Sequence, residues 1–398
     1  MPKPAKAIAD ATKCPILRIA VNTRFLLPRG LEGLGRYTHH LVQELVRLRS
    51  RDEFVFFFDR PYDARYVYAP NVTPVVLRPP ARHPLLWWWW FEMALPAALR
   101  EHRIDVLFSP DNFCSLRSPV PTVMTVHDLG YLHFPEQVTW SARQFYGRYF
   151  PRYVARAERV IAISNYVKAD LVAQYGADPA AITVAHNAPA GDFRPIGEAD
   201  RLATRQRLTG GAPYFLYLGA IQPRKNVATL IRAFDRFKTV TKRPERLVLA
   251  GRFAWRTGAV AAALAASPYR EHILLPGFVS DAERPLLLGS ALAFVLPSHL
   301  EGFGLPVLEA MEAGVPVLTA DASALPEVAG GAALLADPNR QGAWTSSMRQ
   351  LAYDPALRAD LIARGHRNVQ RFSWAASART VSAQIDAAAG QPGLDCMG

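Results

Sequence analysis

Cysteine is scarce in this chain of 398 residues, which contains only Cys14, Cys114 and Cys396. The three lie far apart, form no CxxC pair and join no Cys/His cluster with metal-ligand spacing. This pattern excludes a scaffold held together by disulfides and a zinc site of the finger type. A reducing compartment is the simplest setting for such a chain, so we expect a cytoplasmic protein.

Long hydrophobic runs are missing as well. No stretch of about 18 consecutive apolar residues suggests a membrane-spanning helix. Residues 1–13 lack the apolar run of a secretory signal peptide. We therefore expect a protein that is not secreted by that route and does not cross a membrane. Residues 1–15 and 390–398 are expected to be flexible ends.

Charge is moderate in amount but unbalanced in sign. Charged residues make up 20% and hydrophobic residues 50% of the chain, as in an ordinary globular protein. The formal net charge of +12 favours an anionic partner, which could be a nucleic acid, a phosphorylated substrate or an anionic membrane surface. No motif that reads RNA or DNA accompanies this charge, so we expect no nucleic-acid partner.

Short apolar runs alternate with helical periodicity along both halves of the chain, which predicts α/β domains with parallel sheets wrapped by helices. A proline- and glycine-rich segment separates the halves, giving a first domain at 16–195, a linker at 196–212 and a second domain at 213–372. The expected strands are 16–21, 54–58, 75–77, 106–109, 122–126, 160–163, 182–184, 214–218, 247–250, 273–275, 293–296, 315–319 and 333–335. The expected helices include 37–49, 88–102, 140–157 and one that Ser164 caps.

The stretch 297–310 reads Pro-Ser-His-Leu-Glu-Gly-Phe-Gly-Leu-Pro-Val-Leu-Glu-Ala and follows a predicted buried strand. Its two glycines allow a tight turn, and Pro306 suits the first position of a helix, where a missing N–H costs nothing. The free N–H groups at such a helix start attract an anion, while Glu301 and Glu309 on either side suit hydroxyl groups. A nucleoside diphosphate sugar fits this arrangement, because it has hydroxyl groups at both ends and negative charge in the middle. The alternative is that Glu301 is a solvated loop acid and Glu309 only complements the helix dipole.

Three further features point toward a similar ligand, each with an ordinary alternative. Arg224 and Lys225 stand at a predicted helix start, where cations would face an anion, although solvated basic side chains are common. His127 follows a strand at the edge where doubly wound sheets bind ligands, but it could be a satisfied buried histidine. Gly33 and Gly35 would bring N–H groups toward the cleft, yet their spacing matches no phosphate-binding fingerprint.

Two segments have the composition of a membrane or acceptor surface. The run 87–91 is Trp-Trp-Trp-Trp-Phe, and the segment 148–159 repeats arginine at helical spacing. Peripheral contact with an anionic membrane is one interpretation. The other, which we favour, is aromatic packing in a core and a solvated basic helix face.

A series of short motifs resembles, in content and order, the retaining glycosyltransferases of the GT-B fold, specifically glycosyltransferase family 4. The motifs lie at 33–37, 126–129, 163–167, 218–219, 223–226, 249–251, 275–280, 301–309 and 325–328, and the glutamate pair of 301–309 is the most specific. The resemblance covers about 16–374. It implies two doubly wound, Rossmann-like domains facing across a cleft, the first for the acceptor and the second for the donor, with a helix at 373–389 that crosses back to the first domain.

The resemblance also implies roles for individual residues. Arg224 and Lys225 match the basic pair on the donor diphosphate, and Glu309 matches the residue that holds the ribose. Glu301 matches the residue that faces the donor sugar, and His127 the histidine beside that sugar. The further positions expected on the nucleotide sugar are Gly33, Gly35, Gly219, Phe278, Val279, Gly302, Phe303, Gly304 and Leu305.

One position departs from the family's pattern, because Ala220 stands where many members have an arginine. The diphosphate would then rely more on Arg224 and Lys225. The chain also lacks the Asp-x-Asp motif of the metal-using sugar transferases. Two cations and a helix N-terminus can stabilise a leaving diphosphate, so we expect transfer without a metal or another cofactor.

These features predict a retaining hexosyltransferase. The expected donor is GDP-mannose, because the motifs most resemble those of bacterial mannosyltransferases in polysaccharide assembly. The expected acceptor is a glycan or a lipid-linked saccharide. We expect a cytoplasmic protein, for which peripheral contact with the inner face of the membrane is one interpretation. The alternatives are a nucleotide-sugar isomerase of the same architecture, a non-catalytic nucleotide-sugar-binding subunit, and a transferase that uses a UDP- or dTDP-sugar.

Overall fold

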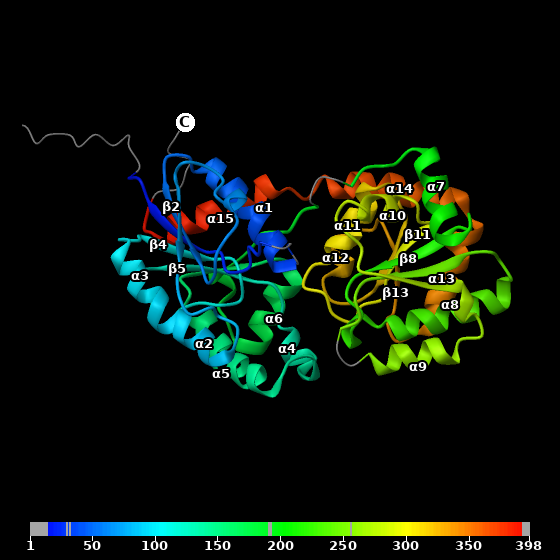
Figure 1. Cartoon of the computed structure of the whole chain (residues 1–398), viewed down its shortest axis with the longest axis horizontal. Helices are drawn as coiled ribbons and strands as arrows, with labels where there is room; N and C mark the ends of the chain where they lie inside the picture. The colour runs from blue at the N-terminus through cyan, green and yellow to red at the C-terminus, as the bar shows by residue number, and fades with distance from the viewer. Residues whose placement is uncertain (1–14, 29–30, 32, 190–192, 255–256, 392–398) are drawn as a thin grey trace, which may run out of the picture.

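The computed structural model describes residues 15–28, 31, 33–189, 193–254 and 257–391. These residues form two α/β domains that lie side by side and contact each other (Figure 1). The ends that we expected to be flexible, 1–15 and 390–398, lie outside the described residues except for Pro15, Gly390 and Gln391.

The first domain is built on a seven-stranded parallel sheet with the order β3-β2-β1-β4-β5-β6-β7. Its strands are β1 (Arg18–Asn22), β2 (Glu53–Phe58), β3 (Val72–Val76), β4 (Val106–Ser109), β5 (Thr122–Val126), β6 (Arg159–Ala162) and β7 (Ile182–Val184). Its helices are α1 (Gly33–Leu48), α2 (Pro84–Trp89), α3 (Leu95–Glu101), α4 (Gly130–His133), α5 (Trp140–Arg156) and α6 (Asn165–Tyr175). A π-helical turn, Trp90–Ala94, joins α2 to α3. Because helices cover both faces, the strands are almost wholly apolar.

The second domain is built on a six-stranded parallel sheet with the order β10-β9-β8-β11-β12-β13. Its strands are β8 (Tyr214–Leu218), β9 (Arg246–Ala250), β10 (Ile273–Gly277), β11 (Ala293–Leu296), β12 (Val317–Ala320) and β13 (Leu334–Ala336). Its helices are α7 (Glu198–Thr209), α8 (Val227–Thr241), α9 (Gly258–Ala266), α10 (Arg284–Gly289), α11 (Leu305–Glu312), α12 (Leu325–Ala329), α13 (Gln341–Tyr353) and α14 (Pro355–Val369).

In each sheet the chain begins at an interior strand, adds two strands on one side and then adds the others on the opposite side. The strand order therefore reverses between β1 and β4 in the first domain and between β8 and β11 in the second. The loops that leave the carboxyl ends of such strands diverge and open a crevice, which is where doubly wound domains bind ligands. In the second domain these loops contain Lys225 and Glu301.

The predicted strands are all present, with ends shifted by a few residues, but two helices begin earlier than the sequence suggested. The helix expected from residue 37 begins at Gly33, so the two glycines lie in its first turn. The helix expected from residue 88 begins at Pro84, where the ring of His83 accepts a hydrogen bond from the N–H of Leu85 at 3.4 Å. Proline at a first helical position costs no hydrogen bond, which explains the earlier start.

The segment expected to be a linker, 196–212, is mostly helical. It contains α7, which Gly210 caps at its C-terminal end with a left-handed φ of 66°. Arg205 Nε donates to the carbonyl oxygen of Ser290 at 2.8 Å, so α7 is attached to the second domain. Glu198 and Asp200 in the first turn favour a helix here, a signal that the neighbouring glycines and prolines obscured.

A final helix, α15 (Trp374–Ala388), lies along α1 of the first domain, as the resemblance implied (Figure 1). Buried Arg49 holds it there, with Nη2 2.8 Å from Asp386 Oδ1 and Nη1 2.8 Å from Ser382 Oγ. The same guanidinium contacts Asp52 Oδ2 at 2.6 Å. The helix α15 therefore packs on the first domain, although it follows the second domain in the sequence.

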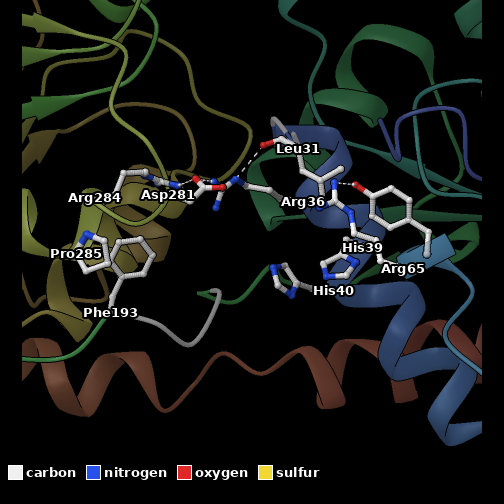
Figure 2. Close-up of a pocket in the computed structure, with 10 residues that line it drawn as sticks. Leu31, Arg36, His39, His40, Arg65, Phe193, Asp281, Arg284 and Pro285 are labelled. Atoms are coloured by element: carbon white, nitrogen blue, oxygen red, sulfur yellow. Dashed lines mark hydrogen bonds and ion pairs between the residues drawn. The ribbon is translucent and has the colours of Figure 1, made fainter. Parts of the chain in front are cut away.

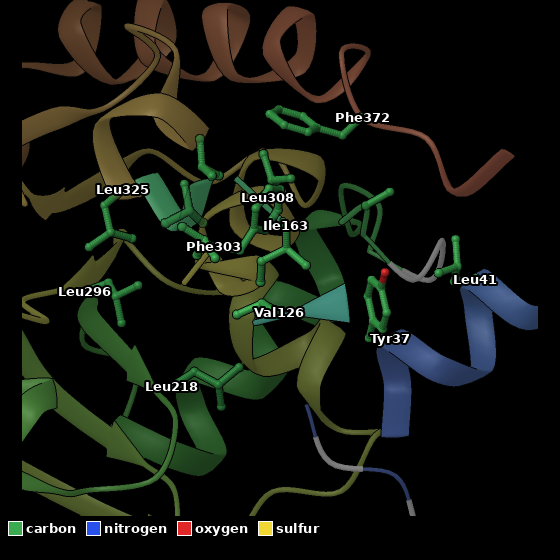
Figure 3. Close-up of a cluster of buried hydrophobic side chains, with 14 of the residues drawn as sticks. Tyr37, Leu41, Val126, Ile163, Leu218, Leu296, Phe303, Leu308, Leu325 and Phe372 are labelled. Atoms are coloured by element: carbon green, nitrogen blue, oxygen red, sulfur yellow. The ribbon is translucent and has the colours of Figure 1, made fainter. Parts of the chain in front are cut away.

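The hydrophobic core continues from one domain into the other. Figure 3 shows buried side chains of both domains around the loop that precedes α11. The ring of Phe303 packs edge-on against Phe372 at 5.6 Å and lies 6.0 Å from His186. The domains are therefore held by apolar contact as well as by polar groups.

The aromatic run and the arginine-rich helix are only partly exposed. Trp90 and Phe91 are buried, as expected for core packing, while 75% of Leu85 and 47% of Trp89 are accessible. Arg148 is exposed on α5. Within the described segments, no helix combines the length and the apolarity that crossing a membrane requires.

We predict that Arg49→Ala lowers the midpoint of thermal unfolding by several degrees, because Asp52 and Asp386 lose a buried cation. Removing one partner of a buried pair typically costs about 3 to 5 kcal/mol. The control is Arg47→Ala, which removes an exposed arginine that pairs only with Glu44 and should change the midpoint little. Equal midpoints for the two variants would show that this contact does not hold α15.

Candidate active site

The glycine turn before α11 has the geometry that its sequence predicts. Gly304 stands at the N-terminal end of the helix with a φ of 103°, a left-handed conformation that favours glycine. Pro306 lies in the first turn, and Gly314 follows the helix with a φ of 70°. Because α11 follows β11, its N-terminal end lies near the carboxyl edge of the sheet, where the strand order reverses between β8 and β11.

Glu301, Lys225 and Arg224 form one ion cluster around a buried carboxylate. Lys225 Nζ lies 2.5 Å from Glu301 Oε1, and Arg224 Nη1 lies 3.4 Å from Glu301 Oε2. Ser298 Oγ donates to Glu301 Oε1 at 2.7 Å, and Arg224 Nη1 donates to the Leu300 carbonyl at 2.7 Å. Only 7% of Glu301 is accessible, so it is not the solvated loop acid of the alternative interpretation.

Burial and pairing act against each other within this cluster. Burial would raise the pKa of Glu301, but the charges of Lys225 and Arg224 outweigh it and lower that pKa. Burial lowers the pKa of Lys225, and the attraction of Glu301 offsets only part of this effect. Two cations share one carboxylate, so the three side chains together carry a net positive charge.

Glu309 is also buried and paired, but with a different cation. Its Oε2 lies 2.6 Å from Arg284 Nη2, and 3% of the residue is accessible. Burial raises the pKa of Glu309, while Arg284 and Arg36 partly oppose that shift. Glu309 is the fifth residue of α11, beyond the first turn, so complementing the helix dipole does not explain it.

His127 is a neutral histidine held from two sides. Its backbone N–H donates to Asn112 Oδ1 at 2.8 Å, and its Nε2 lies 2.8 Å from the carbonyl oxygen of Pro110. Since a carbonyl only accepts, Nε2 carries the proton and Nδ1 is the acceptor of the ring. Burial lowers the pKa of His127, which keeps the ring neutral.

Gly302 brings the two domains into contact beside His127. A side chain at this position would overlap the carbonyl oxygen of His127. The carbonyl of Gly302 accepts a hydrogen bond of 2.7 Å from Ser164 Oγ, which also caps α6. Absence of a side chain at Gly302 therefore permits the domains to close.

Glu327 of the second domain binds the N-terminus of α6 in the first. Its Oε1 accepts from the N–H of Asn165 and from His186 Nε2, each at 2.9 Å, and its Oε2 accepts from the N–H of Tyr166 at 3.2 Å. Burial would raise the pKa of Glu327, but the bond from His186 and those from α6 outweigh it and lower the pKa. This carboxylate is a second polar link between the domains.

A cavity of about 280 Å³ lies between the domains on the side of α1 (Figure 2). Arg36, His39 and Arg65 line it from the first domain, and Asp281 and Arg284 line it from the second. Asp281 forms an ion pair with Arg36 and lies 3.6 Å from Arg284. A chain of alternating charges thus runs from α1 to Glu309, as the dashed contacts of Figure 2 show in part.

The other residues predicted to contact the nucleotide sugar lie on several elements of both domains. Gly219 follows β8 with a φ of 152°, and Gly35 lies in α1 where a Cβ would come within 2.6 Å of the Phe25 carbonyl. Phe278 is 76% accessible beyond β10. The remaining ones are half-buried Val279 and Leu305, exposed Gly33 at the start of α1, and Phe303, which packs between the domains.

Sequence reasoning missed three residues of the site. Arg284 and Asp281 gave no signal, because nothing distinguishes them from other charged residues of a basic chain. Glu327 belonged to a family motif, but its role between domains becomes visible only once the domains are placed. Among the described residues, no group of three His, Cys, Asp or Glu side chains is arranged to hold a metal ion.

Two family models match the chain, one in each domain. The model described as Glycosyltransferase Family 4 matches residues 31–188, and the model described as Glycosyl transferases group 1 matches residues 200–368. The chain is a family 4 glycosyltransferase. Its cluster of Glu301, Lys225 and Arg224 and its paired Glu309 all lie in the second matched region.

Two curated relatives are mannosyltransferases. The glycosyltransferase is 28% identical to the O-antigen chain mannosyltransferase B of Escherichia coli, over 86% of this chain and 93% of that protein. It is 24% identical to the O-antigen chain mannosyltransferase RfbU of Salmonella typhimurium, over 77% of this chain and 81% of that protein.

A solved structure with the same fold is that of Anabaena HepE in complex with UDP and glucose. It superposes with a TM-score of 0.72 at 17% identity and covers 93% of this chain and 99% of that chain. The glycosyltransferase therefore has the GT-B fold, and it is a hexosyltransferase by family.

We predict that Gly302→Ala reduces turnover about a hundredfold, because the new methyl group pushes the loop before α11 away from His127. Gly302 does not lie in the left-handed region, so the substitution acts through space alone. Nucleotide affinity should change less than turnover, because Lys225, which is predicted to contact the diphosphate, lies on a different loop. The measurements are kcat, nucleotide affinity and the radius of gyration by small-angle scattering.

The control is Gly342→Ala, because a Cβ at Gly342 in α13 meets nothing within 4 Å. Its kcat should match that of the unaltered protein. A Gly302→Ala variant with the turnover of this control would show that closure against His127 is not required.

Proposed function

We propose that this glycosyltransferase moves mannose from GDP-mannose to a saccharide acceptor, with retention of the anomeric configuration and without a metal ion. The observation that carries the proposal is the cluster of Arg224, Lys225 and buried Glu301, which lies on the loops that follow β8 and β11. The similarity to two O-antigen mannosyltransferases supports the choice of sugar, and with it a glycan or a lipid-linked saccharide as acceptor.

The cluster suits a leaving diphosphate. Transfer from a nucleotide sugar leaves negative charge on the diphosphate and positive charge on the sugar ring. Arg224, Lys225 and the N–H groups of α11 supply donors that are already oriented before the reaction. These groups make a bound metal unnecessary for neutralising the diphosphate.

The two glutamates suit the neutral ends of the donor. Glu301 adjoins the cations and the domain boundary at Gly302, where a sugar on the diphosphate would lie. Glu309 is close to the interdomain cavity and shares its carboxylate with Arg284. A ribose at Glu309 would place the base along the loop that contains Phe278 and Val279.

We also propose that the protein acts in the cytoplasm at the inner face of a membrane. Leu85 and Trp89 are exposed four residues apart on α2, and exposed Arg82 precedes the helix. An apolar strip beside basic side chains favours the surface of an anionic membrane. This contact would bring the enzyme to a lipid-linked acceptor.

The donor is tested by thermal-shift measurements in EDTA with GDP-mannose, UDP-glucose and dTDP-glucose. A ligand at about 100 times its dissociation constant should stabilise the protein by about 2.7 kcal/mol, and we expect this shift with GDP-mannose. A larger shift with UDP- or dTDP-glucose would identify a different donor. Activity that EDTA abolishes and Mg²⁺ restores would contradict metal-independent transfer.

The same preparation separates a transferase from an isomerase. A transferase needs an acceptor and forms a new glycosidic bond, whose anomeric configuration NMR reads directly. We expect the α configuration of GDP-mannose to persist in the product. An inverted product would contradict retention, and a changed nucleotide sugar formed without an acceptor would establish the isomerase.

We predict different consequences for Glu309→Gln and Glu301→Gln. Loss of a charged acceptor for the ribose should weaken the binding of free GDP about 10- to 100-fold in Glu309→Gln. Glu301→Gln should bind GDP at least as well as the unaltered protein, since it leaves the cations unpaired. Its kcat should fall about 100- to 1,000-fold, because the lost contact strengthens as charge develops on the sugar.

Glutamine keeps the size of each side chain, so thermal midpoints measured in parallel show whether either variant is merely less stable. Titration calorimetry with GDP and steady-state kinetics on both variants provide the comparison. Equal losses of GDP affinity in the two variants would refute the division of roles between the glutamates.

A further inference from the structure

A second cavity, of about 380 Å³, lies within the first domain, away from the donor cluster. Loops that follow β1, β2, β3 and β4 enclose it at the carboxyl edge of the sheet. The residues that line it are Arg24, Phe25, Leu27, Asp59, Arg60, Ala81, Arg82, Trp87, Phe113 and Tyr146. It includes the point between β1 and β4 where the strand order reverses, which corresponds to the donor crevice of the second domain.

Arg24 is a buried cation with an unused donor. Only 5% of the residue is accessible, and its Nε lies 2.7 Å from Asp111 Oδ2. Its guanidinium carbon stands 3.9 Å from the ring centroid of Phe113. Its Nη2 is buried and has no hydrogen-bond partner in the described structure. An unpaired buried donor is unfavourable, so an acceptor atom of a ligand that reached Nη2 from the cavity would satisfy it.

Asp111 fixes the position of this arginine. Its carboxylate also accepts from Asn22 Nδ2 at 3.1 Å and from the N–H of Phe113 at 3.0 Å. Arg24 therefore cannot turn toward solvent without breaking a buried network.

Aromatic rings form the opposite part of the cavity. Trp87 is half-buried and stacks on Tyr146 with an angle of 8° and a centroid distance of 5.6 Å. Trp87 Nε1 donates to the Ala81 carbonyl at 2.9 Å, so the indole plane is fixed. Such rigid rings suit the apolar faces of a sugar ring, whose hydroxyl groups require a few placed donors.

The charges of the cavity suit a neutral ligand. Arg60 forms two bonds of 2.6 Å with Asp59, and Arg24 is paired with Asp111. Among the described residues that line the cavity, only exposed Arg82 has a charged side chain without an ion pair.

We propose that this cavity, the Arg24–Trp87 pocket, binds a neutral saccharide unit of the acceptor that precedes the sugar receiving the transferred residue. The proposal rests on the proposed transferase function. The loop 110–113 connects the two places, because Phe113 lines the pocket while Pro110 and Asn112 hold His127. An extended acceptor would thus have one sugar in the pocket and its reactive end beside His127.

The test measures the binding of α-mannotriose to the full chain in the presence of saturating GDP, by saturation-transfer NMR. The unaltered protein should bind the trisaccharide. Trp87→Leu and Phe25→Ala should each weaken this binding about five- to tenfold, because each removes an aromatic face. GDP affinity should be unchanged in both. Phe25→Ala decides the test if Trp87→Leu does not fold.

The control is Trp140→Leu, which removes a 77% exposed tryptophan outside the pocket and should leave both ligands unaffected. Displacement of mannotriose by GDP, or equal mannotriose affinity in all the variants, would overturn the proposal. If the unaltered protein does not bind GDP-mannose, but its binding of mannotriose still depends on Trp87, the proposed donor is refuted and the pocket is not. GDP-mannose binding without Trp87-dependent mannotriose binding would refute the pocket alone.

Discussion

The backbone contact between Gly302 and His127 is the constraint on which the rest of the site depends. A side chain cannot be accommodated there, so the loop before α11 lies directly against the first domain. That loop carries Glu301 on one side of the contact and the start of α11 on the other. Backbone packing therefore brings the cluster of Glu301, Lys225 and Arg224 close to His127. The polar links of Ser164 and Glu327 add to a contact that shape already determines.

Burial of charge is the second organising feature. Each glutamate of the stretch has its own cation, Lys225 for Glu301 and Arg284 for Glu309, and both pairs are largely hidden from water. Since an unpaired buried charge is costly, these pairs keep the ligand-free site stable. A bound donor would share its hydroxyl and phosphate groups with the same partners. Arg284 also adjoins Asp281, which pairs with Arg36 across the cleft, so events at Glu309 can influence how the domains meet.

Much of the fold could be predicted because its signals are local. Apolar runs predicted the strands. Gly304 and Pro306 predicted the turn and the helix that follow β11. The helix at Glu198–Thr209 was missed because flanking glycines and prolines dominate its segment, although acids in its first turn favour helix. Phe303 shows a different limit. Its position in a motif predicts a contact with the nucleotide sugar, and only the structure shows that its ring also packs beside His186 and Phe372.

The candidate site could be predicted only in part, since its pairing is not local. Residues 76 apart in the chain form the Lys225–Glu301 pair, and no pattern in the sequence announces the pairing of Arg284 with Glu309. Both domains have the same type of strand order, and this shared topology explains which side chains sequence analysis overlooks. Each sheet reverses its strand order once, and each reversal creates a crevice that loops from distant segments must line. In the second domain those loops carry family motifs, so the crevice was visible in the sequence. In the first domain they carry Arg24 and Trp87, whose shared cavity exists only after four strands are placed side by side.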